Sequence, residues 1–313
     1  MSEMAIVTEE LSKSYGKVEA VRSLNLRVPR GAVYGFLGRN GAGKTTTMRM
    51  LMGLARPTQG FARLLGMNPE NEAERVRLLE RAAFLPQKKQ LYPWMTPAEL
   101  VRFSRSFFPQ WSDEVANRTA RAMEIPMGRM FRKLSHGNQT KVALLLALAQ
   151  GADVLVLDEP TAGLDPVMVD EVLRMLVDEH VSEGRTIFFS SHQLEEVEQI
   201  CDWVGILEQG RLLLEARLEE IRREYRLVIG SGENLPKEPF ADAVAVSSEG
   251  RFCKYVVARN AEQFGAELAK QGATILEVSP LGLRELFLQL VRKEETCTPG
   301  NAGGKRETVS TLP

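Results

Sequence analysis

The octapeptide Gly38-Arg39-Asn40-Gly41-Ala42-Gly43-Lys44-Thr45 fits the pattern G-x-x-x-x-G-K-[ST] without a mismatch. Its glycines let the backbone curl so that successive N–H groups face one anion. The apolar residues 32–37 before it predict a buried strand, and residues 45–54 after it predict a helix that ends near Gly53 and Pro57. In this setting the pattern predicts a phosphate-binding loop. Lys44 is expected to reach the β- and γ-phosphates, and the Thr45 hydroxyl to ligate Mg²⁺. The glycine spacing does not fit G-x-G-x-x-G, which disfavours a dinucleotide fold.

Two acids, Asp158 and Glu159, directly follow the apolar run 154–157. Ligands of open α/β sheets bind beyond the carboxyl ends of the strands, so both acids are expected to face the phosphate loop. Asp158 is suited to hold Mg²⁺, and Glu159 is suited to polarise the attacking water as general base. Ser190-Ser191-His192 ends the next apolar strand at the same edge, which predicts a contact of His192 with the γ-phosphate.

The order of these elements predicts a doubly wound α/β sheet. The runs 154–157 and 186–189 are fully apolar, as in strands covered on both faces, and residues 171–180 between them have helical spacing. Leu24, Leu26 and Val28 alternate with polar residues, as in a half-buried strand. Residues 88–149 are expected to be mainly helical, with a helix start at 96–99, and residues 205–214 to form a hairpin around 209–210.

A second region begins near Leu218. Residues 219–224 predict a charged helical linker. Strand-like pieces at 254–258 and 274–278 then mix with helix-like pieces at 261–270 and 283–291. This mixture predicts a small α+β domain. From Lys293 onward Gly, Thr, Pro and charged residues dominate, which predicts a disordered tail.

The bulk composition is that of an ordinary globular protein, with 44% hydrophobic and 26% charged residues. Lys+Arg is 40 and Asp+Glu is 41, so no nucleic-acid partner is expected. The three cysteines, Cys201, Cys253 and Cys297, are widely spaced, which favours a reducing compartment over a disulfide framework or a zinc site. There is no signal-peptide pattern. The longest apolar run, 142–149, is far shorter than the ~20 residues of a membrane-spanning helix. Any action at a membrane would therefore need a partner.

Taken in order, the motifs resemble the nucleotide-binding subunits of ABC transporters over about residues 6–218. The ordered set comprises Tyr15, the phosphate loop, Gln87, the signature-like Leu134-Ser135-His136-Gly137-Asn138, the acid pair, the D-loop Ala162-Gly163-Leu164-Asp165, and His192. The resemblance implies a P-loop NTPase core with an antiparallel β subdomain and a helical subdomain at about 88–150. These lie in a domain spanning 4–218. A C-terminal α+β domain at 219–292, accessory or regulatory, and the tail at 293–313 complete the expected organisation.

The resemblance also implies roles for single residues. Tyr15 would stack on adenine, and residues 38–46 would bind ATP, with Thr46 at the α-phosphate. Gln87 would sense Mg²⁺ and the attacking water and link the site to a membrane partner. Ser135 and Gly137, with Asn138, would bind the γ-phosphate of ATP held by the other subunit, beside the D-loop Asp165. They precede an apolar helix, whose N-terminus attracts anions.

The implied assembly is a homodimer or heterodimer on a membrane-spanning permease, peripheral to the cytoplasmic face of the cell membrane, with ATP and Mg²⁺. The usual signature is Leu-Ser-Gly-Gly-Gln, and His136 and Asn138 depart from it. This departure is expected to affect the rate of ATP turnover more than the presence of activity. The C-terminal domain and residues 279–287 look like bacterial ABC-2 type exporter ATPases, which implies export. Residues 91–95, with Tyr92 and Trp94, are candidates for the partner dock, and simple packing explains them equally well.

Two other functions stay open. A soluble ABC ATPase acting on DNA or ribosomes typically carries two cassettes or a long coiled-coil insertion, and this sequence has one cassette and no long heptad run. A non-catalytic nucleotide sensor is favoured by the altered signature. It is disfavoured by the presence of Glu159 and His192, which degenerate sensors tend to lose.

Overall fold

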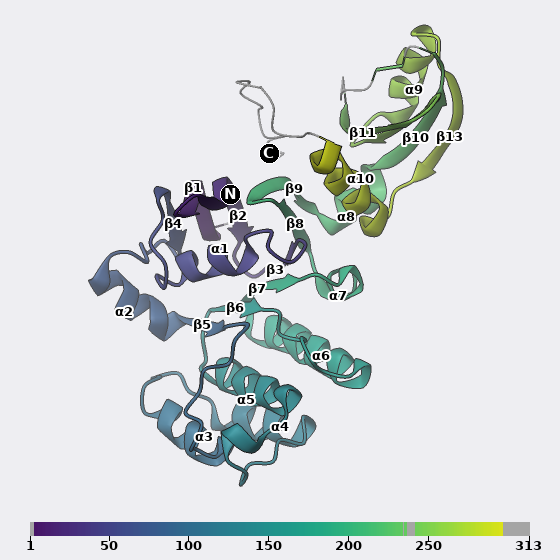
Figure 1. Cartoon of the computed structure of the whole chain (residues 1–313). Helices are drawn as coiled ribbons and strands as arrows, with labels where there is room; N and C mark the ends of the chain where they lie inside the picture. Colours follow the sequence, from purple (N-terminus) through teal and green to yellow (C-terminus); the bar gives the residue numbers. More distant parts are fainter. Residues whose placement is uncertain (1–2, 234, 237–241, 297–313) are drawn as a thin grey trace. The chain divides into compact units, whose positions relative to one another are not determined.

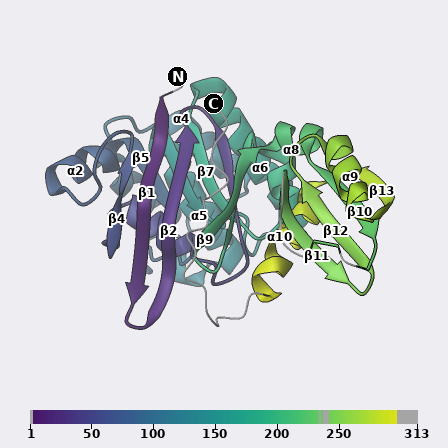
Figure 2. The same cartoon turned by 90° about the horizontal axis from the view of Figure 1, so that it is seen from above.

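The computed structural model describes residues 3–233, 235–236 and 242–296 (Figures 1 and 2). The chain divides into two compact units. The first comprises Met1–Cys201 and Gln209–Leu212, and the second comprises Asp202–Glu208 and Leu213–Pro313.

The first unit is built on parallel strands that pair in the order β5 (Ala82–Leu85), β6 (Val154–Asp158), β7 (Thr186–Ser191) and β3 (Val33–Leu37). Every residue of β3, β6 and β7 is buried, as the apolar runs predicted for strands covered on both faces. In the register, Leu37 lies opposite Ser191, and Ser190 lies opposite Asp158. The carboxyl ends of these strands therefore meet at one edge, and the predicted α/β core is confirmed.

An antiparallel sheet of order β2-β1-β4 also belongs to the first unit. It contains β1 (Met4–Tyr15), β2 (Val18–Pro29) and β4 (Gln59–Leu64), and Figure 2 shows β1 and β2 as a long ribbon. The alternating apolar side chains of β2 are buried, as predicted. Helix α1 (Lys44–Leu51) begins one residue earlier than predicted. It also ends three residues before the predicted end, because the chain turns at Gly53 with φ of 67°. Helix α2 (Glu72–Arg81) follows β4 along the chain.

A cluster of helices forms the end of the first unit that lies away from β1 and β2 in Figure 1. It contains α3 (Pro97–Arg105), α4 (Asp113–Ala122), the short 3₁₀ helix η1 (Phe131–Lys133) and α5 (His136–Ala149). The predicted helix start is confirmed as a capping box. The Thr96 hydroxyl accepts from the N–H of Glu99, and the Glu99 carboxylate accepts from the N–H of Thr96.

A buried ion-pair network ties this cluster to the core through helix α6 (Pro166–Glu183), which is followed by β7 and then α7 (Leu194–Ile200). The Glu179 carboxylate on α6 accepts from Arg118 of α4 at 2.6 Å and from Arg185 at 2.5 Å. Arg185 also donates to the carbonyl of Leu148 at the end of α5. Because Glu179 and Arg185 are buried, this network fixes where α4 and α5 sit against the core.

The predicted hairpin is formed by β8 (Trp203–Glu208) and β9 (Arg211–Arg217), and helix α8 (Leu218–Glu224) follows it along the chain. An antiparallel sheet follows in the order β11 (Ala243–Glu249), β12 (Phe252–Val257), β10 (Arg226–Ser231) and β13 (Thr274–Pro280). Strands β12 and β13 correspond to predicted pieces. Strands β10 and β11 were missed.

Two helices cover the sheet of the second unit. Phe264 and Leu268 of α9 (Ala261–Lys270) pack with Tyr255 in the core of one face. Gln289 of α10 (Leu283–Thr296) accepts from Ser247, whose side chain points away from that face because neighbouring strand residues alternate. Residues 297–313, with most of the predicted tail and Cys297, lie outside the described residues. Within the described part of the chain, no helix is both long enough and apolar enough to cross a membrane.

Candidate functional site

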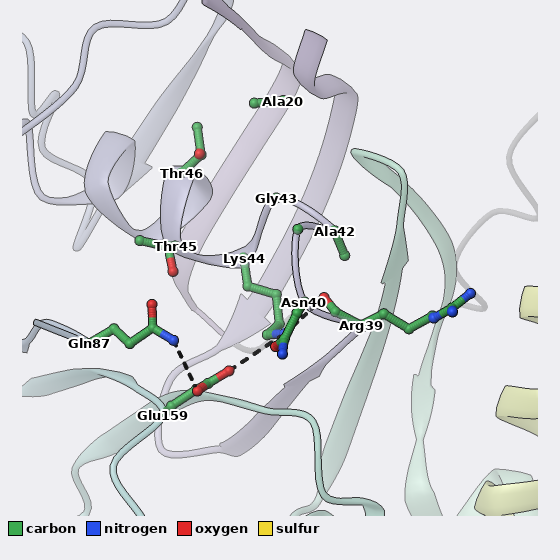
Figure 3. Close-up of a pocket in the computed structure, with 11 residues that line it drawn as sticks. Ala20, Arg39, Asn40, Ala42, Gly43, Lys44, Thr45, Thr46, Gln87 and Glu159 are labelled. Atoms are coloured by element: carbon green, nitrogen blue, oxygen red, sulfur yellow. Dashed lines mark hydrogen bonds and ion pairs between the residues drawn. The ribbon is translucent and has the colours of Figure 1, made fainter. Parts of the chain in front are cut away.

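A cavity of the first unit lies where β3 runs through the glycine-rich loop into α1 (Figure 3). It has a volume of about 250 Å³. Its lining gathers residues that the sequence predicted to meet, together with Ala20, which it did not: Ala20, Arg39, Asn40, Gly41, Ala42, Gly43, Lys44, Thr45, Thr46, Gln87 and Glu159. Gly43 is the N-cap of α1 and has no side chain that could accept a hydrogen bond from the backbone N–H groups of the first helical turn. The N-terminus of such a helix is suited to bind an anion.

Lys44 holds a buried positive charge against the loop. Its Nζ atom donates to the carbonyl oxygens of Gly38, at 2.6 Å, and Arg39, at 3.2 Å. The same atom lies 3.9 Å from Oε1 of Glu159, and Figure 3 shows the two side chains pointing toward one another. The lysine side chain is 5% exposed, so its charge acts with little screening by water.

Asp158, at the end of β6, joins the loop helix to the neighbouring strand. Its Oδ2 accepts from the Thr45 hydroxyl at 2.7 Å, and its Oδ1 accepts from the Ser190 hydroxyl at 2.7 Å. The Ser190 hydroxyl also accepts from the N–H of Glu159 at 3.0 Å. Ser190 was not singled out from the sequence as a site residue, although its place at the end of the strand beside β6 could have indicated it. Hydroxyl and carboxylate oxygens side by side suit a Mg²⁺ ion.

Glu159 is the point on which the predicted catalytic side chains converge. Nε2 of Gln87 donates to its Oε2 at 3.1 Å, and Nδ1 of His192 lies 3.3 Å from its Oε1. Glu159 itself has a φ of 50°, a left-handed conformation that costs a non-glycine residue about 1 kcal/mol or more. Such strain is typical of functional sites, where the surrounding structure holds a side chain in one direction.

Lys89 is a site neighbour that sequence reasoning missed. Its Nζ donates to the carbonyl oxygen of Gln87 at 3.1 Å, and the side chain is half-buried. Burial lowers the pKa of the Lys89 ammonium below its usual range, and the attraction of Asp158 and Glu159 opposes this shift. The pair Lys88-Lys89 directly after Gln87 was the available signal. The ammonium adds positive charge on the side of the cavity where Gln87 lies.

Tyr15 lies at the end of the β1–β2 hairpin, opposite Val18, and is 50% exposed. The Lys13 ammonium lies 5.0 Å from the ring centroid. The same hairpin contributes Ala20 to the cavity, which puts the tyrosine on an element that borders the site. The roles of Tyr15 in stacking on adenine and of Thr46 at the α-phosphate stay predictions.

The signature-like segment is away from this cavity, which none of its residues lines. Ser135 is the N-cap of α5 and accepts from the N–H of Asn138 at 3.3 Å. The first turn of α5 packs on the D-loop instead. Gly163 has a φ of 80°, and a side chain there would come within 2.8 Å of the His136 ring. Asp165 caps α6 by accepting from the N–H of Met168 at 3.1 Å.

Comparison with known proteins gives a consistent result. A family model described as ABC transporter matches residues 21–162. The bacitracin transport ATP-binding protein BcrA of Enterococcus faecalis is 34% identical over 72% of this chain and 73% of its own length. The Nod factor export ATP-binding protein I of Paraburkholderia xenovorans is 33% identical over 94% of this chain and 99% of its own. A solved ATP binding subunit of an ABC transporter matches with a TM-score of 0.63 at 26% identity, over 70% of this chain and 92% of that one.

Proposed function

Since this chain belongs to the ABC transporter family of ATP-binding subunits and is an ATPase, we propose that it powers export through a separate membrane-spanning subunit. In this proposal ATP with Mg²⁺ binds at residues 38–46 and closes a dimer, and hydrolysis opens the dimer again. A relative named as a Nod factor export ATP-binding protein supports export as the direction of transport. The protein would act at the cytoplasmic face of the membrane.

The observation that carries the proposal is the convergence of Gln87, Lys44 and His192 on the carboxylate of Glu159 beside the loop cavity. A general base must lie within hydrogen-bond reach of the proton that it takes, and it must be oriented. Here an amide and an imidazole orient the carboxylate, and the phosphate-loop lysine faces it. This arrangement suits attack of water on a γ-phosphate bound in the loop.

The hydrolytic step follows from this geometry. The water oxygen forms a bond to the γ-phosphorus while the bond from that phosphorus to the ADP oxygen breaks, and Glu159 takes the proton that the water loses. Gln87 orients the water, and Lys44 stabilises charge on the phosphate oxygens. His192 donates to an oxygen of the transferred phosphoryl group. Because Gln87 and Lys44 already contact Glu159 before ATP arrives, these groups stabilise the transition state with little reorganisation.

We assign the Mg²⁺ position to the hydroxyl of Thr45 and the carboxylate of Asp158, with Gln87 nearby. The contact between Thr45 and Asp158 brings together two oxygen ligands of the kind that Mg²⁺ prefers. When bound, the ion would neutralise charge on the β- and γ-phosphates. Ser190 holds the second oxygen of Asp158 and so fixes the direction of the carboxylate.

The dimer part of the proposal rests on α5. Ser135, Gly137 and Asn138 lie at the N-terminus of this largely buried helix, and Ser135 and Asn138 do not line the cavity of their own chain. A helix N-terminus attracts anions, so these residues are suited to the γ-phosphate of ATP bound by a second copy or a related subunit. Asp165 starts α6 beside them and is proposed to lie at the same interface.

A row of aromatic rings, here called the aromatic surface, is proposed to dock the membrane subunit. It consists of Tyr92, Trp94, Phe103 and Phe107. Their ring centroids are 5.4 Å apart for Tyr92 and Trp94, 5.3 Å for Tyr92 and Phe103, and 4.9 Å for Phe103 and Phe107. All four are exposed, Trp94 by 62%. The surface follows Gln87 in the sequence, so docking there could act on the catalytic site.

The altered signature, with His136 and Asn138, is the one observation that favours a nucleotide sensor that does not hydrolyse ATP, and the family relationship disfavours that alternative. A phosphate-release assay on the purified protein, with and without its membrane partner, separates the two. Release of phosphate that falls in the Glu159→Gln variant supports the proposal. Absence of release under both conditions supports the sensor.

The docking part has its own test, which is affinity purification of the tagged chain from detergent-solubilised membranes. We expect an integral membrane protein with several hydrophobic spans to be recovered, and Trp94→Ser to reduce its yield. Val181→Ser on α6 replaces another exposed apolar residue and is the matched control. Recovery of ribosomes in place of a membrane protein would favour the soluble ABC ATPase.

A further inference from the structure

His192 lies in the short connection between β7 and α7, and its ring is weakly held. The imidazole has one polar contact among the described residues, the Glu159 carboxylate at 3.3 Å, and its side chain is 47% exposed. The position of the ring therefore depends on the backbone that carries it, residues 191–193. An exposed ring with one contact would otherwise sample several rotamers.

The Ser191 hydroxyl braces this backbone from inside. It accepts from the N–H of Gln193 at 2.9 Å and so spans the peptide groups on both sides of His192. The same hydroxyl lies 2.6 Å from Oε2 of Glu196 and 3.3 Å from the carbonyl oxygen of Gln193. A hydroxyl has one proton, and the shorter bond is the one to Glu196. Donation to Glu196 directs the lone pairs of the hydroxyl toward the Gln193 N–H.

Glu196 is held beneath Ser191 by the packing of α7 on the sheet. A side chain at Gly35 of β3 would lie 2.7 Å from Val197, so only a glycine lets α7 approach this closely. Glu196 is 3% exposed, and its second oxygen has no hydrogen-bond partner among the described residues. Burying a carboxylate is unfavourable unless it is hydrogen-bonded. Here the bond that it does make goes to the hydroxyl that braces His192.

We propose that Glu196 and Ser191 are positioning residues that hold His192 in the direction of the γ-phosphate. Glu196 orients the Ser191 hydroxyl, the hydroxyl fixes the Gln193 peptide, and the fixed backbone limits where the imidazole can point. This role rests on the proposed function of His192 as a phosphate contact. Neither residue lines the cavity at the phosphate loop, so in this proposal both act on the chemical step through His192.

Turnover measurements test the kinetic side. We expect Glu196→Ala and Ser191→Ala each to lower kcat roughly tenfold, as for loss of one hydrogen bond to a charged group, with the KM for ATP within about twofold. Glu196→Gln keeps an oxygen that accepts from Ser191 and should restore most of the turnover. Glu195→Ala, an exposed acid on the same helix, is the matched control. In a His192→Ala background, Glu196→Ala should have no further effect.

Imidazole NMR tests the geometry without ATP. The chain contains three histidines, His136, His180 and His192, so His192→Ala assigns the signals. In nucleotide-free protein, Glu196→Ala and Ser191→Ala should shift or broaden the His192 signals and leave those of His136 and His180 in place. Ser191→Ala, the smaller change, serves if Glu196→Ala does not fold.

Three results would overturn the assignment. They are unchanged His192 signals in both variants, an equal loss of turnover in Glu196→Gln and Glu196→Ala, or an undiminished effect of Glu196→Ala without His192. Failure of the proposed function would give a different set of results from failure of this positioning role. Wild-type protein would then release no phosphate, while the NMR response of His192 to Glu196→Ala would still occur.

Discussion

The ammonium nitrogen of Lys44 lies 3.9 Å from Oε1 of Glu159, so the lysine of the glycine-rich loop and the acid that directly follows β6 face the same space. The positive and negative groups hold each other while that space contains no phosphate. A γ-phosphate bound in this space would accept from the Lys44 ammonium in place of Glu159. The Glu159 carboxylate would then face the attacking water. Binding and catalysis can therefore be separated by changing one of the two residues.

Replacing Glu159 with glutamine should leave ATP binding intact and lower turnover by roughly 10²–10⁴-fold, because the amide keeps the size of the side chain and cannot accept the proton of water. Equilibrium nucleotide binding and phosphate release measure the two effects. With Mg²⁺ and ATP, the variant should accumulate as a dimer in size-exclusion chromatography with light scattering. Turnover at the wild-type rate would remove Glu159 from the role of general base.

Replacing Lys44 with alanine should weaken ATP binding roughly ten- to a hundredfold, which corresponds to loss of a charged hydrogen bond of about 1.5–3 kcal/mol. Titration with a fluorescent ATP analogue gives the dissociation constant. Lys270→Ala, an exposed lysine at the end of α9, changes the charge equally and should bind ATP as the wild type does. Equal affinities in all three proteins would contradict the assigned phosphate contact.

Replacing Asp158 with asparagine should raise the Mg²⁺ concentration needed for half-maximal turnover roughly tenfold or more, because a negatively charged ligand is lost while the side-chain volume stays the same. Turnover measured against Mg²⁺ concentration gives the midpoint, and EDTA should abolish wild-type turnover. An unchanged midpoint would mean that the metal is held elsewhere.

Replacing Gly163 with alanine should destabilise the fold by about 1–3 kcal/mol, because the residue has a left-handed conformation and the new methyl group meets the His136 ring. Gly184→Ala is the matched control. It also has a positive φ, of 63°, and its side chain would meet nothing within 4 Å. Urea denaturation should show a larger loss for Gly163→Ala, and adding His136→Ala should recover the difference between the two glycine variants.

Replacing Glu179 with alanine should cost about 3–5 kcal/mol of stability, because it leaves the buried guanidinium of Arg185 without its carboxylate. Replacing Arg118 should cost about 1 kcal/mol or less, since that side chain is half exposed and water replaces its ion pair. Denaturant unfolding of both variants gives the order. Equal losses of stability in the two variants would show that burial of these side chains does not determine the cost of removing them.

Much of the site was predictable because its signals are local. The phosphate loop, the acid pair after an apolar strand and the capping box at Thr96 each depend on a few consecutive residues, and each lies where the sequence placed it. Strands β10 and β11 were missed because polar and apolar residues do not alternate regularly along them, which gives no clear period.

The sequence alone predicted that a glycine-rich loop follows a buried strand and that Asp158, Glu159 and His192 lie at or just after the ends of strands at one edge, because these signals are patterns of a few consecutive residues. Only the tertiary structure decided which side chains touch. Gln87 is 72 positions from Glu159, and Ser190 is 32 from Asp158. Both pairs meet because β5, β6 and β7 pack side by side, and that pairing depends on contacts across the whole core.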